Sequence, residues 1–360
     1  MADYAAVNGV AAANIEKVNG VAKASVQAVN GATTPSSGAT QWALSAADAG
    51  VGYASNSDLT SWTTYETVAS ESTDYRTIAY GKDGSGSALW VVGWSQNPKE
   101  VMYSSDITNT SGFSDVDLAG GIHDVCWGNN VWIAVGNNIS SRKGCYRSTD
   151  GASWSEVDMS GATGINTATM FAVGNSGSKW LIAQEDRLYS SSDGSSWSLA
   201  HDFNDSATTI YDLKYTNDTW ILLIIRTSGG AGSGAYVRTA APSDLTDWSA
   251  EQNINIGTSA RRFAAGNGKA IFINANNHQL VTVSGKTCTV ESYSSGQLPS
   301  ANSRDIATDG STWVVVHDSG DISTSTDNGA NWTLSVDGLV IDGNNPAHLD
   351  SVAAGIYLPV

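Results

Sequence analysis

The chain has 360 residues, of which 41% are hydrophobic and only 15% are charged, and its formal net charge is −17. Nucleic acids and anionic membrane surfaces are bound through basic patches, so this acidic balance argues against both as partners. The three cysteines (Cys126, Cys145 and Cys288) are too widely spaced for a zinc signature or a disulfide framework, and no apolar run reaches the roughly 18 residues of a membrane-spanning helix.

The first 38 residues carry a repeat of their own. Val7-Asn-Gly-Val10, Val18-Asn-Gly-Val21 and Val29-Asn-Gly-Ala32 recur every 11 residues. The alanine-rich stretches 11–17 and 22–28 are predicted to form short helices that end at the Asn-Gly pairs. Helices this short are marginal alone, so we expect residues 1–38 to be an anchoring leader that docks on another surface. A disordered leader is the alternative. The apolar stripe that would dock comprises Val7, Val10, Ile15, Val18, Val21, Val26 and Val29.

Repeated Val-Asn-Gly-Val segments of this kind resemble the N-terminal regions of structural proteins in tailed bacteriophages. The resemblance covers about 35 residues. It implies that the leader attaches the protein to a virion and that the following domain is displayed. No basic segment precedes a hydrophobic core, so no secretory signal is expected.

Residues 39–360 contain a longer repeat, marked by tryptophans that open apolar runs. The tryptophans follow one another at steps of 48, 42, 48 and 40 residues, and then at a double step of 93. A period of about 40–50 residues rich in short strands indicates a propeller or a related repeat array. These tryptophans are Trp42, Trp90, Trp132, Trp180, Trp220 and Trp313.

Each repeat is predicted to form four short strands, as in 76–80, 89–94, 101–105 and 113–118 of the second repeat. The first repeat (42–68) lacks its inner strand, and residues 350–355 have the missing pattern. We therefore expect an all-β, seven-bladed β-propeller whose C-terminal strand completes the first blade and closes the ring. The other repeats span 123–159, 169–203, 210–253, 261–293 and 304–339.

An aspartate-bearing turn precedes a second tryptophan in most repeats. Three examples are Ser148-Thr-Asp-Gly-Ala-Ser-Trp154, Ser191-Ser-Asp-Gly-Ser-Ser-Trp197 and Ser325-Thr-Asp-Asn-Gly-Ala-Asn-Trp332, and 57–62 and 243–248 are looser versions. These turns resemble the Asp-box (bacterial neuraminidase) repeat, a family that includes sialidases and many non-enzymatic propellers. Side chains of this kind accept hydrogen bonds from turn amides, so we interpret the aspartates as structural. They are Asp58, Asp150, Asp193, Asp244 and Asp327.

One residue per blade is predicted to lie at the same height around the central channel. These residues are Arg76, His123, Thr169, Tyr211, Arg261, Arg304 and Asp350. Clustered guanidiniums suit a carboxylate or phosphate, which makes Arg76, Arg261, Arg304, Tyr211 and Asp350 the candidate ligand-binding residues. The alternative is that the arginines pair with Asp74, Asp305 or Asp350 and only solvate the channel.

The resemblance to sialidases would imply three arginines beside a tyrosine–glutamate pair. The Phe-Arg-Ile-Pro segment of sialidases is absent from the sequence, and no glutamate begins an inner strand. The five histidines also lack metal-ligand spacing, so we expect no catalytic residue, no metal and no other cofactor.

These patterns favour a non-enzymatic virion structural protein of a tailed bacteriophage. Residues 1–35 would contact other virion proteins, and the propeller would decorate the particle or touch a host surface glycan or protein. No membrane insertion is expected. The alternative is a glycan-binding or sialidase-like propeller that uses the arginines of the channel. A third possibility is a cellular assembly factor that grips a partner chain on one propeller face.

Overall fold

A computed structural model describes most of residues 41–355 and six two-residue strands that precede them in the chain. The described part contains no helix with the length and hydropathy that a bilayer crossing requires. Within 41–355, the residues outside the description are 47–49, 56–57, 67–74, 95–100, 109–112, 119, 138–143, 228–231, 276, 292–297, 301 and 342–346, with the side chains of Tyr75 and Arg76.

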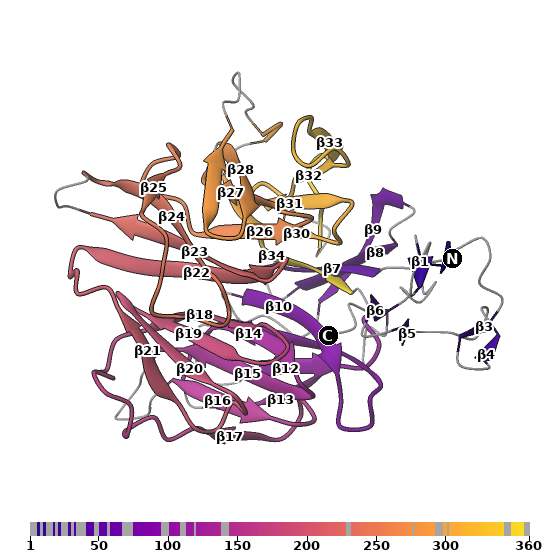
Figure 1. Ribbon diagram of the computed structural model, residues 1–360. Helices are drawn as coiled ribbons and strands as arrows, with labels where there is room; N and C mark the ends of the chain where they lie inside the picture. The colour runs from indigo at the N-terminus through magenta and orange to yellow at the C-terminus, as the bar shows by residue number, and fades with distance from the viewer. Residues whose placement is uncertain are drawn as a thin grey trace.

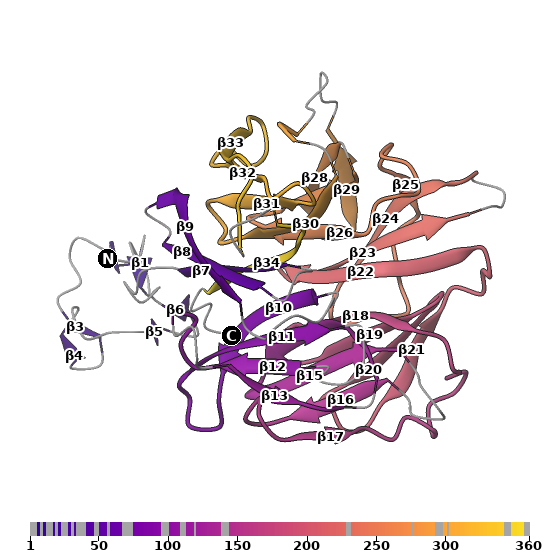
Figure 2. The ribbon, with the colours of Figure 1, turned by 180° about the vertical axis from the view of Figure 1, so that it is seen from behind.

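Residues 41–355 form seven four-stranded antiparallel sheets, and Figures 1 and 2 show the sheets from opposite sides. The strands of the first four sheets follow, from the inner strand outward. Blade 1 contains β34 (Leu349–Gly355), β7 (Gln41–Ala46), β8 (Gly50–Ser55) and β9 (Asp58–Glu66). Blade 2 contains β10 (Tyr75–Lys82), β11 (Ala88–Trp94), β12 (Val101–Ser104) and β13 (Ser114–Val116). Blade 3 contains β14 (Ile122–Gly128), β15 (Val131–Gly136), β16 (Cys145–Ser148) and β17 (Trp154–Glu156). Blade 4 contains β18 (Met170–Asn175), β19 (Trp180–Gln184), β20 (Arg187–Ser191) and β21 (Ser198–Asp202).

The remaining three sheets repeat the same order. Blade 5 contains β22 (Thr208–Thr216), β23 (Thr219–Arg226), β24 (Gly234–Ala240) and β25 (Gln252–Asn253). Blade 6 contains β26 (Arg262–Gly266), β27 (Lys269–Ile273), β28 (His278–Ser284) and β29 (Thr287–Val290). Blade 7 contains β30 (Ser303–Thr308), β31 (Trp313–His317), β32 (Ile322–Ser325) and β33 (Thr333–Val336). The predicted count of seven blades is confirmed.

The ring is closed by the C-terminal strand, as the sequence predicts. β34 pairs antiparallel with β7, and its register places Ala353 opposite Ala43 and Ala354 opposite Trp42. β34 also packs against the inner strands of both neighbours, β30 and β10. The inner strand of blade 1 thus comes from the far end of the chain, which leaves neither side of that blade open.

The hydrophobic core is divided into seven clusters, one between each pair of neighbouring blades. The tryptophans that open the apolar runs are the largest side chains in these clusters and are buried. Inner-strand glycines make room for them: a Cβ on Gly355 would lie 2.6 Å from the ring of Trp90. In blade 6, where Ala270 replaces the tryptophan, the stacked rings of Phe263 and Phe272 contribute to the core, with centroids 4.6 Å apart.

The leader differs from its prediction. Its six strands pair as three hairpins: β1 (Ala6–Val7) with β2 (Val10–Ala11), β3 (Lys17–Val18) with β4 (Val21–Ala22), and β5 (Ala28–Val29) with β6 (Ala32–Thr33). In the sequence, each Asn-Gly pair stands between the two strands of one hairpin, and Asn-Gly is a favoured two-residue hairpin loop. The predicted helices are wrong at their ends, which lie in strands. Residues 12–16 and 23–27, including Ile15 and Val26, lie outside the described residues.

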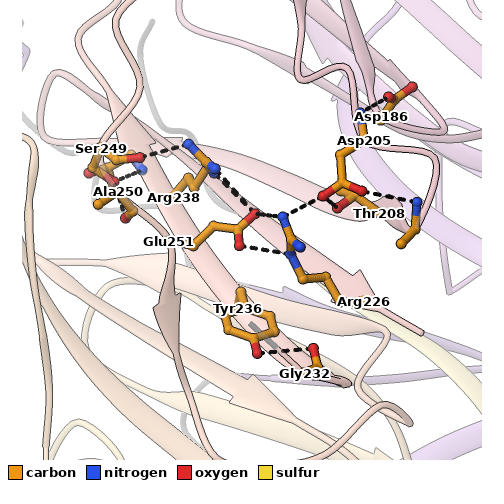
Figure 3. Close-up of polar contacts among 12 residues, drawn as sticks. Asp186, Asp205, Thr208, Arg226, Gly232, Tyr236, Arg238, Ser249, Ala250 and Glu251 are labelled. Atoms are coloured by element: carbon orange, nitrogen blue, oxygen red, sulfur yellow. Dashed lines mark hydrogen bonds and ion pairs between the residues drawn. The ribbon is translucent and has the colours of Figure 1, made fainter. Parts of the chain in front are cut away.

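Blade 5 is tied to blade 4 by an ionic network at the end of its long strands (Figure 3). Arg226 lies between Asp205 and Glu251, with its Nε 2.8 Å from a carboxylate oxygen of Glu251. Arg238 approaches the other oxygen of Glu251 at 3.2 Å, and Asp186 of blade 4 accepts a hydrogen bond from the Asp205 amide. Because Arg226 and Arg238 pair with Asp205 and Glu251, and Asp205 is in turn bonded to Asp186 of blade 4, we infer that this network helps to hold the two blades together.

Candidate functional site

The inner strands present one residue each at one end of the channel because most of them contain a β-bulge. A bulge leaves one residue unpaired and re-aims its side chain. In blade 6, Arg261 directly precedes β26 and takes the equivalent position. The predicted alignment is correct except in blade 4, where the bulged residue is Phe171 and Thr169 lies two residues before it. The bulged residues are Arg76, His123, Phe171, Tyr211, Arg304 and Asp350.

A cavity of about 490 Å³, called the vestibule below, opens among these residues. Its lining comes from blades 3 to 7 and from β34, which places it on the channel axis. Arg76 lies in β10, but its side chain is outside the described residues, so its contribution stays a prediction. The ring residues that line the vestibule are His123, Phe171, Tyr211, Arg261, Arg304 and Asp350.

Arg261 is held in a fixed position in the vestibule wall. Its guanidinium carbon lies 4.1 Å from the centroid of the Tyr211 ring, and its Nη1 donates to the carbonyl oxygens of Thr258 and Ala260 at 2.6 and 2.8 Å. In the part of the chain that the structure describes, no carboxylate lies within ion-pair distance of Arg261. The stacked guanidinium therefore keeps an edge of donors for a ligand.

Arg304 is engaged differently. Its Nη2 lies 2.9 Å from Asp318, whose other oxygen lies 2.9 Å from His348. Burial opposes ionisation of Asp318, but the hydrogen bonds from His348 and Arg304 outweigh it and lower the pKa of Asp318. The alternative drawn from the sequence, pairing with Asp74, Asp305 or Asp350, did not include this partner of Arg304: Asp318 directly follows β31 in the same blade.

Three buried aspartates, Asp124, Asp212 and Asp305, each directly follow a ring residue on an inner strand, and we call them the belt. The sequence analysis did not identify them as a group. Each carboxylate accepts a backbone N–H from the inner strand of the next blade. The bonds are Val173 N–H to Asp124 at 3.0 Å, Phe263 N–H to Asp212 at 3.1 Å and Val352 N–H to Asp305 at 3.0 Å. The sequence signal was available, because an aspartate directly follows the ring position in blades 3, 5 and 7.

Two cations, Lys214 and Arg262, offset part of the charge of the three belt aspartates. Lys214 Nζ lies 2.8 Å from Asp212 Oδ1. Burial alone would lower the pKa of Lys214, but the attraction of Asp212 and Asp124 outweighs it and raises that pKa. Burial raises the pKa of both Asp124 and Asp305, although the neighbouring cations act in the opposite direction.

Arg262 is the second cation and closes the channel. It occupies the belt position of blade 6, and its Nη2 donates to the carbonyl oxygen of His123 in blade 3 at 3.2 Å. It lines both the vestibule and a second cavity of about 430 Å³ on the other side of the belt. The second cavity is walled largely by small side chains such as Ala79, Ala265 and Ala307. Arg262 therefore separates a polar chamber from a more apolar one.

The aspartate-bearing turns at the outer strands form the expected local hydrogen bonds. In blade 3, Asp150 accepts the backbone N–H groups of Ala152 and Ser153 at 2.9 and 2.7 Å, and Trp154 Nε1 donates to the carbonyl of Gly151. Asp193 and Asp327 repeat this pattern of accepting turn amides, and Asp58 and Asp244 each accept one N–H, from Thr60 and Thr246.

Blade 2 contains a turn of the same kind that the sequence analysis missed. Asp106 accepts the backbone N–H of Thr108 at 2.9 Å, as Asp58 and Asp244 do for their threonines. Its local sequence, Ser105-Asp106-Ile107-Thr108, matches the looser turns but has no tryptophan at the corresponding place. Among the described residues, no group of three or more His, Cys, Asp or Glu side chains has the arrangement of a metal site.

No protein-family model and no curated protein matches the chain. Similar solved structures include YCF48 bound to D1 peptide (14% identity, TM-score 0.52, covering 77% of this chain and 85% of that one). YCF48 from Cyanidioschyzon merolae is 12% identical (TM-score 0.52, 74% and 86% covered). PorZ, a surface component of the type-IX secretion system of Porphyromonas gingivalis, is 11% identical (TM-score 0.52, 83% and 37% covered). Identities this low show a shared propeller fold alone. They do not support the Asp-box family or a phage origin, which remain predictions.

Proposed function

We propose that the chain is a non-enzymatic structural protein on the surface of a tailed-bacteriophage virion. The leader docks to other virion proteins, and the propeller is displayed as a decoration or host-contact module. The observation that carries this proposal is the leader repeat: three hairpins that follow one another at 11-residue intervals. Two-residue strand pairs are too small to be stable alone, so the leader needs a surface to dock on.

The contacts within the propeller support the view that it folds independently of the leader. Its closing strand, β34, comes from the C-terminal side, and its inner strands are joined to one another by the belt. The contacts that close the ring are therefore made by residues 41–355. We expect residues 36–360 to fold without the leader.

The test compares the full chain with residues 36–360 by light scattering, each alone and mixed with candidate phage particles. We expect the shortened chain to be a folded monomer and only the full chain to assemble or bind particles. A matched control scrambles residues 1–35, which keeps the composition and removes the 11-residue spacing. Incorporation of the shortened or scrambled chain at the level of the full chain would contradict the proposal.

A second proposed function, ligand binding in the vestibule, is favoured by the convergence of His123, Tyr211, Arg261, Arg304 and Asp350 on one cavity. A surface glycan is the ligand class that this reading favours. We infer binding and not hydrolysis, because the described lining of the vestibule contains no glutamate and the face of Tyr211 is covered by Arg261. Titration with glycans, read out by calorimetry, tests this second function independently of the leader.

A further inference from the structure

We propose that the propeller docks on a basic surface of the virion with one particular face, the face opposite the vestibule, and that the vestibule points away from the particle. The proposal rests on the first proposed function, attachment through the leader. Three features of the molecule carry it: the point at which the leader joins the ring, the difference between the connections on the two faces, and a recess at the centre of the face that docks. The charge of that face indicates the kind of partner.

The leader joins the ring at the end away from the vestibule. The chain passes from the leader into β7, whose first residue, Gln41, pairs with Gly355 at the end of β34. Asp350 lies near the opposite end of β34 and lines the vestibule, whereas Ala354 lines the second cavity. A leader that binds the particle therefore places the second-cavity end of the ring nearest to the particle.

This end of the ring is built from short turns, and we call it the turn face. The hairpins that connect the inner strand of a blade to its second strand lie there, and the longest of them, 83–87, has five residues. The aspartate-bearing turns lie on the same face: a Cβ on Gly84 would lie 3.6 Å from the Cβ of Asp150. The hairpin turns are residues 83–87, 129–130, 176–179, 217–218, 267–268 and 309–312.

The vestibule face has longer connections. From the outer strand of one blade to the inner strand of the next, the chain runs through Val157–Thr169 and through Ile254–Arg261. Long loops on a rigid scaffold are the usual place for specific contacts. The even surface of the turn face therefore suits docking, and the vestibule face suits exposure.

The second cavity opens at the centre of the turn face. Its lining reaches the last residues of β10 and β30, Lys82 and Thr308, and includes the aromatic side chains of Tyr80 and Trp127. Lys82 Nζ lies 5.9 Å from the centroid of the Trp127 ring. The turn face therefore has a partly apolar centre within a polar rim, which is the arrangement of a protein–protein interface.

The rim of the turn face is acidic. Asp83, Asp218 and Asp309 lie in its hairpin turns, and Lys179 is the only basic residue within those turns. The aspartate-bearing turns add further carboxylates. Because opposite potentials attract across an interface, the virion surface that receives this face should be basic.

The experiment places one cysteine on each face and compares its labelling by a maleimide in the free full chain and in the particle-bound full chain. Ser178→Cys lies in the hairpin turn 176–179, and its matched control, Ser259→Cys, lies in the vestibule lining. Both serines are exposed. The unaltered chain gives the background from its own cysteines. We expect particle binding to abolish the labelling of Ser178→Cys and to leave that of Ser259→Cys.

A second pair of variants tests the charge. Asp309→Asn removes one charge from the turn face and keeps an oxygen that can accept the Ser311 and Thr312 N–H groups. Asp321→Asn does the same at the vestibule end of blade 7, where the carboxylate accepts the Gly338 N–H. We expect Asp309→Asn to weaken particle binding by about two- to fivefold, the effect of one exposed ion pair, and Asp321→Asn to leave it unchanged.

Each outcome separates the docking face from the leader. Protection of Ser259→Cys alone, of both cysteines or of neither would overturn docking through the turn face and leave attachment through the leader intact. Binding of Asp309→Asn as tight as that of Asp321→Asn would overturn the basic partner. Failure of the full chain to bind particles would contradict the first proposed function, and the docking face with it.

Discussion

The inner belt and the outer turns of the propeller both use aspartates that accept backbone N–H groups, but the bonds span very different lengths of chain. In the belt, the donor of each bond lies in the next blade, 47 to 51 residues away. In the turn of Asp150, the donors lie two and three residues away. The belt therefore holds blades together, whereas each turn shapes only its own blade.

The two regions also differ in the state of the carboxylate. Burial raises the pKa of Asp124 and Asp305 in the belt. At Asp150, burial acts in the same direction, but the hydrogen bonds from the Ser153 and Ala152 amides outweigh it and lower the pKa. The same residue type thus contributes to tertiary structure at one edge of the blade and to local structure at the other.

Replacement of Asp212 by alanine should give the largest effect. Asp212 is fully buried, and its loss leaves the N–H groups of Leu213 and Phe263 and the Lys214 ammonium without their acceptor. Leaving a buried donor without its acceptor costs about 1–3 kcal/mol, and the part contributed by Lys214 is reduced because 37% of its side chain is exposed. Urea unfolding of the variant should show a loss of that size in the free energy of unfolding.

A double variant separates charge from hydrogen bonding at this position. Asp212→Ala combined with Lys214→Met removes both charges, so the cost should fall below that of Asp212→Ala alone. If Asp212→Ala cost no more than a turn variant, the belt would not be holding the blades together, and the contrast between the two regions would fail.

The contrast also explains which parts of the fold could be predicted from sequence. The spacing of Trp42, Trp90 and the later tryptophans revealed the blades, because each blade buries the same side chain at the same place. The pattern of residues 350–355 revealed the closing strand. Local turns such as that of Asp150 could be predicted because all their partners lie within a few residues.

The belt could not be derived as easily. Its aspartates can be found in the sequence after the ring position, but the N–H groups that they accept become apparent only when the next blade is in place. Arg262 is a stronger case: its contact with His123 spans 139 residues and crosses the channel. The error at Thr169 arose because a bulge shifts the residue that faces the channel, and the sequence does not mark the bulge. The prediction of helices at 11–17 and 22–28 treated the Asn-Gly pairs only as helix ends and did not consider that Asn-Gly also favours a hairpin turn.

Replacement of Asp150 by alanine should have a smaller effect than any belt variant. The N–H groups of Ala152 and Ser153 lose the acceptor that they share, but both donors are near the surface and can bond to water. By analogy with the loss of a helix cap, the cost is about 1 kcal/mol. Urea unfolding checks this value, and Gly161→Ala, where an added Cβ meets no atom within 4 Å, serves as a neutral control in the same blade. A cost equal to that of Asp212→Ala would remove the distinction between local and tertiary bonds.

The smallest effect is the most diagnostic, because the opposite pKa shifts predict opposite pH dependence. The pKa of Asp150 is lowered on folding, so its contribution is present above the unfolded value of about 3.9 and lost as the pH falls through the folded pKa. The pKa of Asp305 is raised, so its contribution is present below about 3.9 and lost as the pH rises through the folded pKa. Urea unfolding between about pH 3 and about pH 7 should show the cost of Asp150→Asn growing and that of Asp305→Asn shrinking. Parallel curves would mean that the belt titrates like a surface carboxylate, and burial would then not distinguish the two regions.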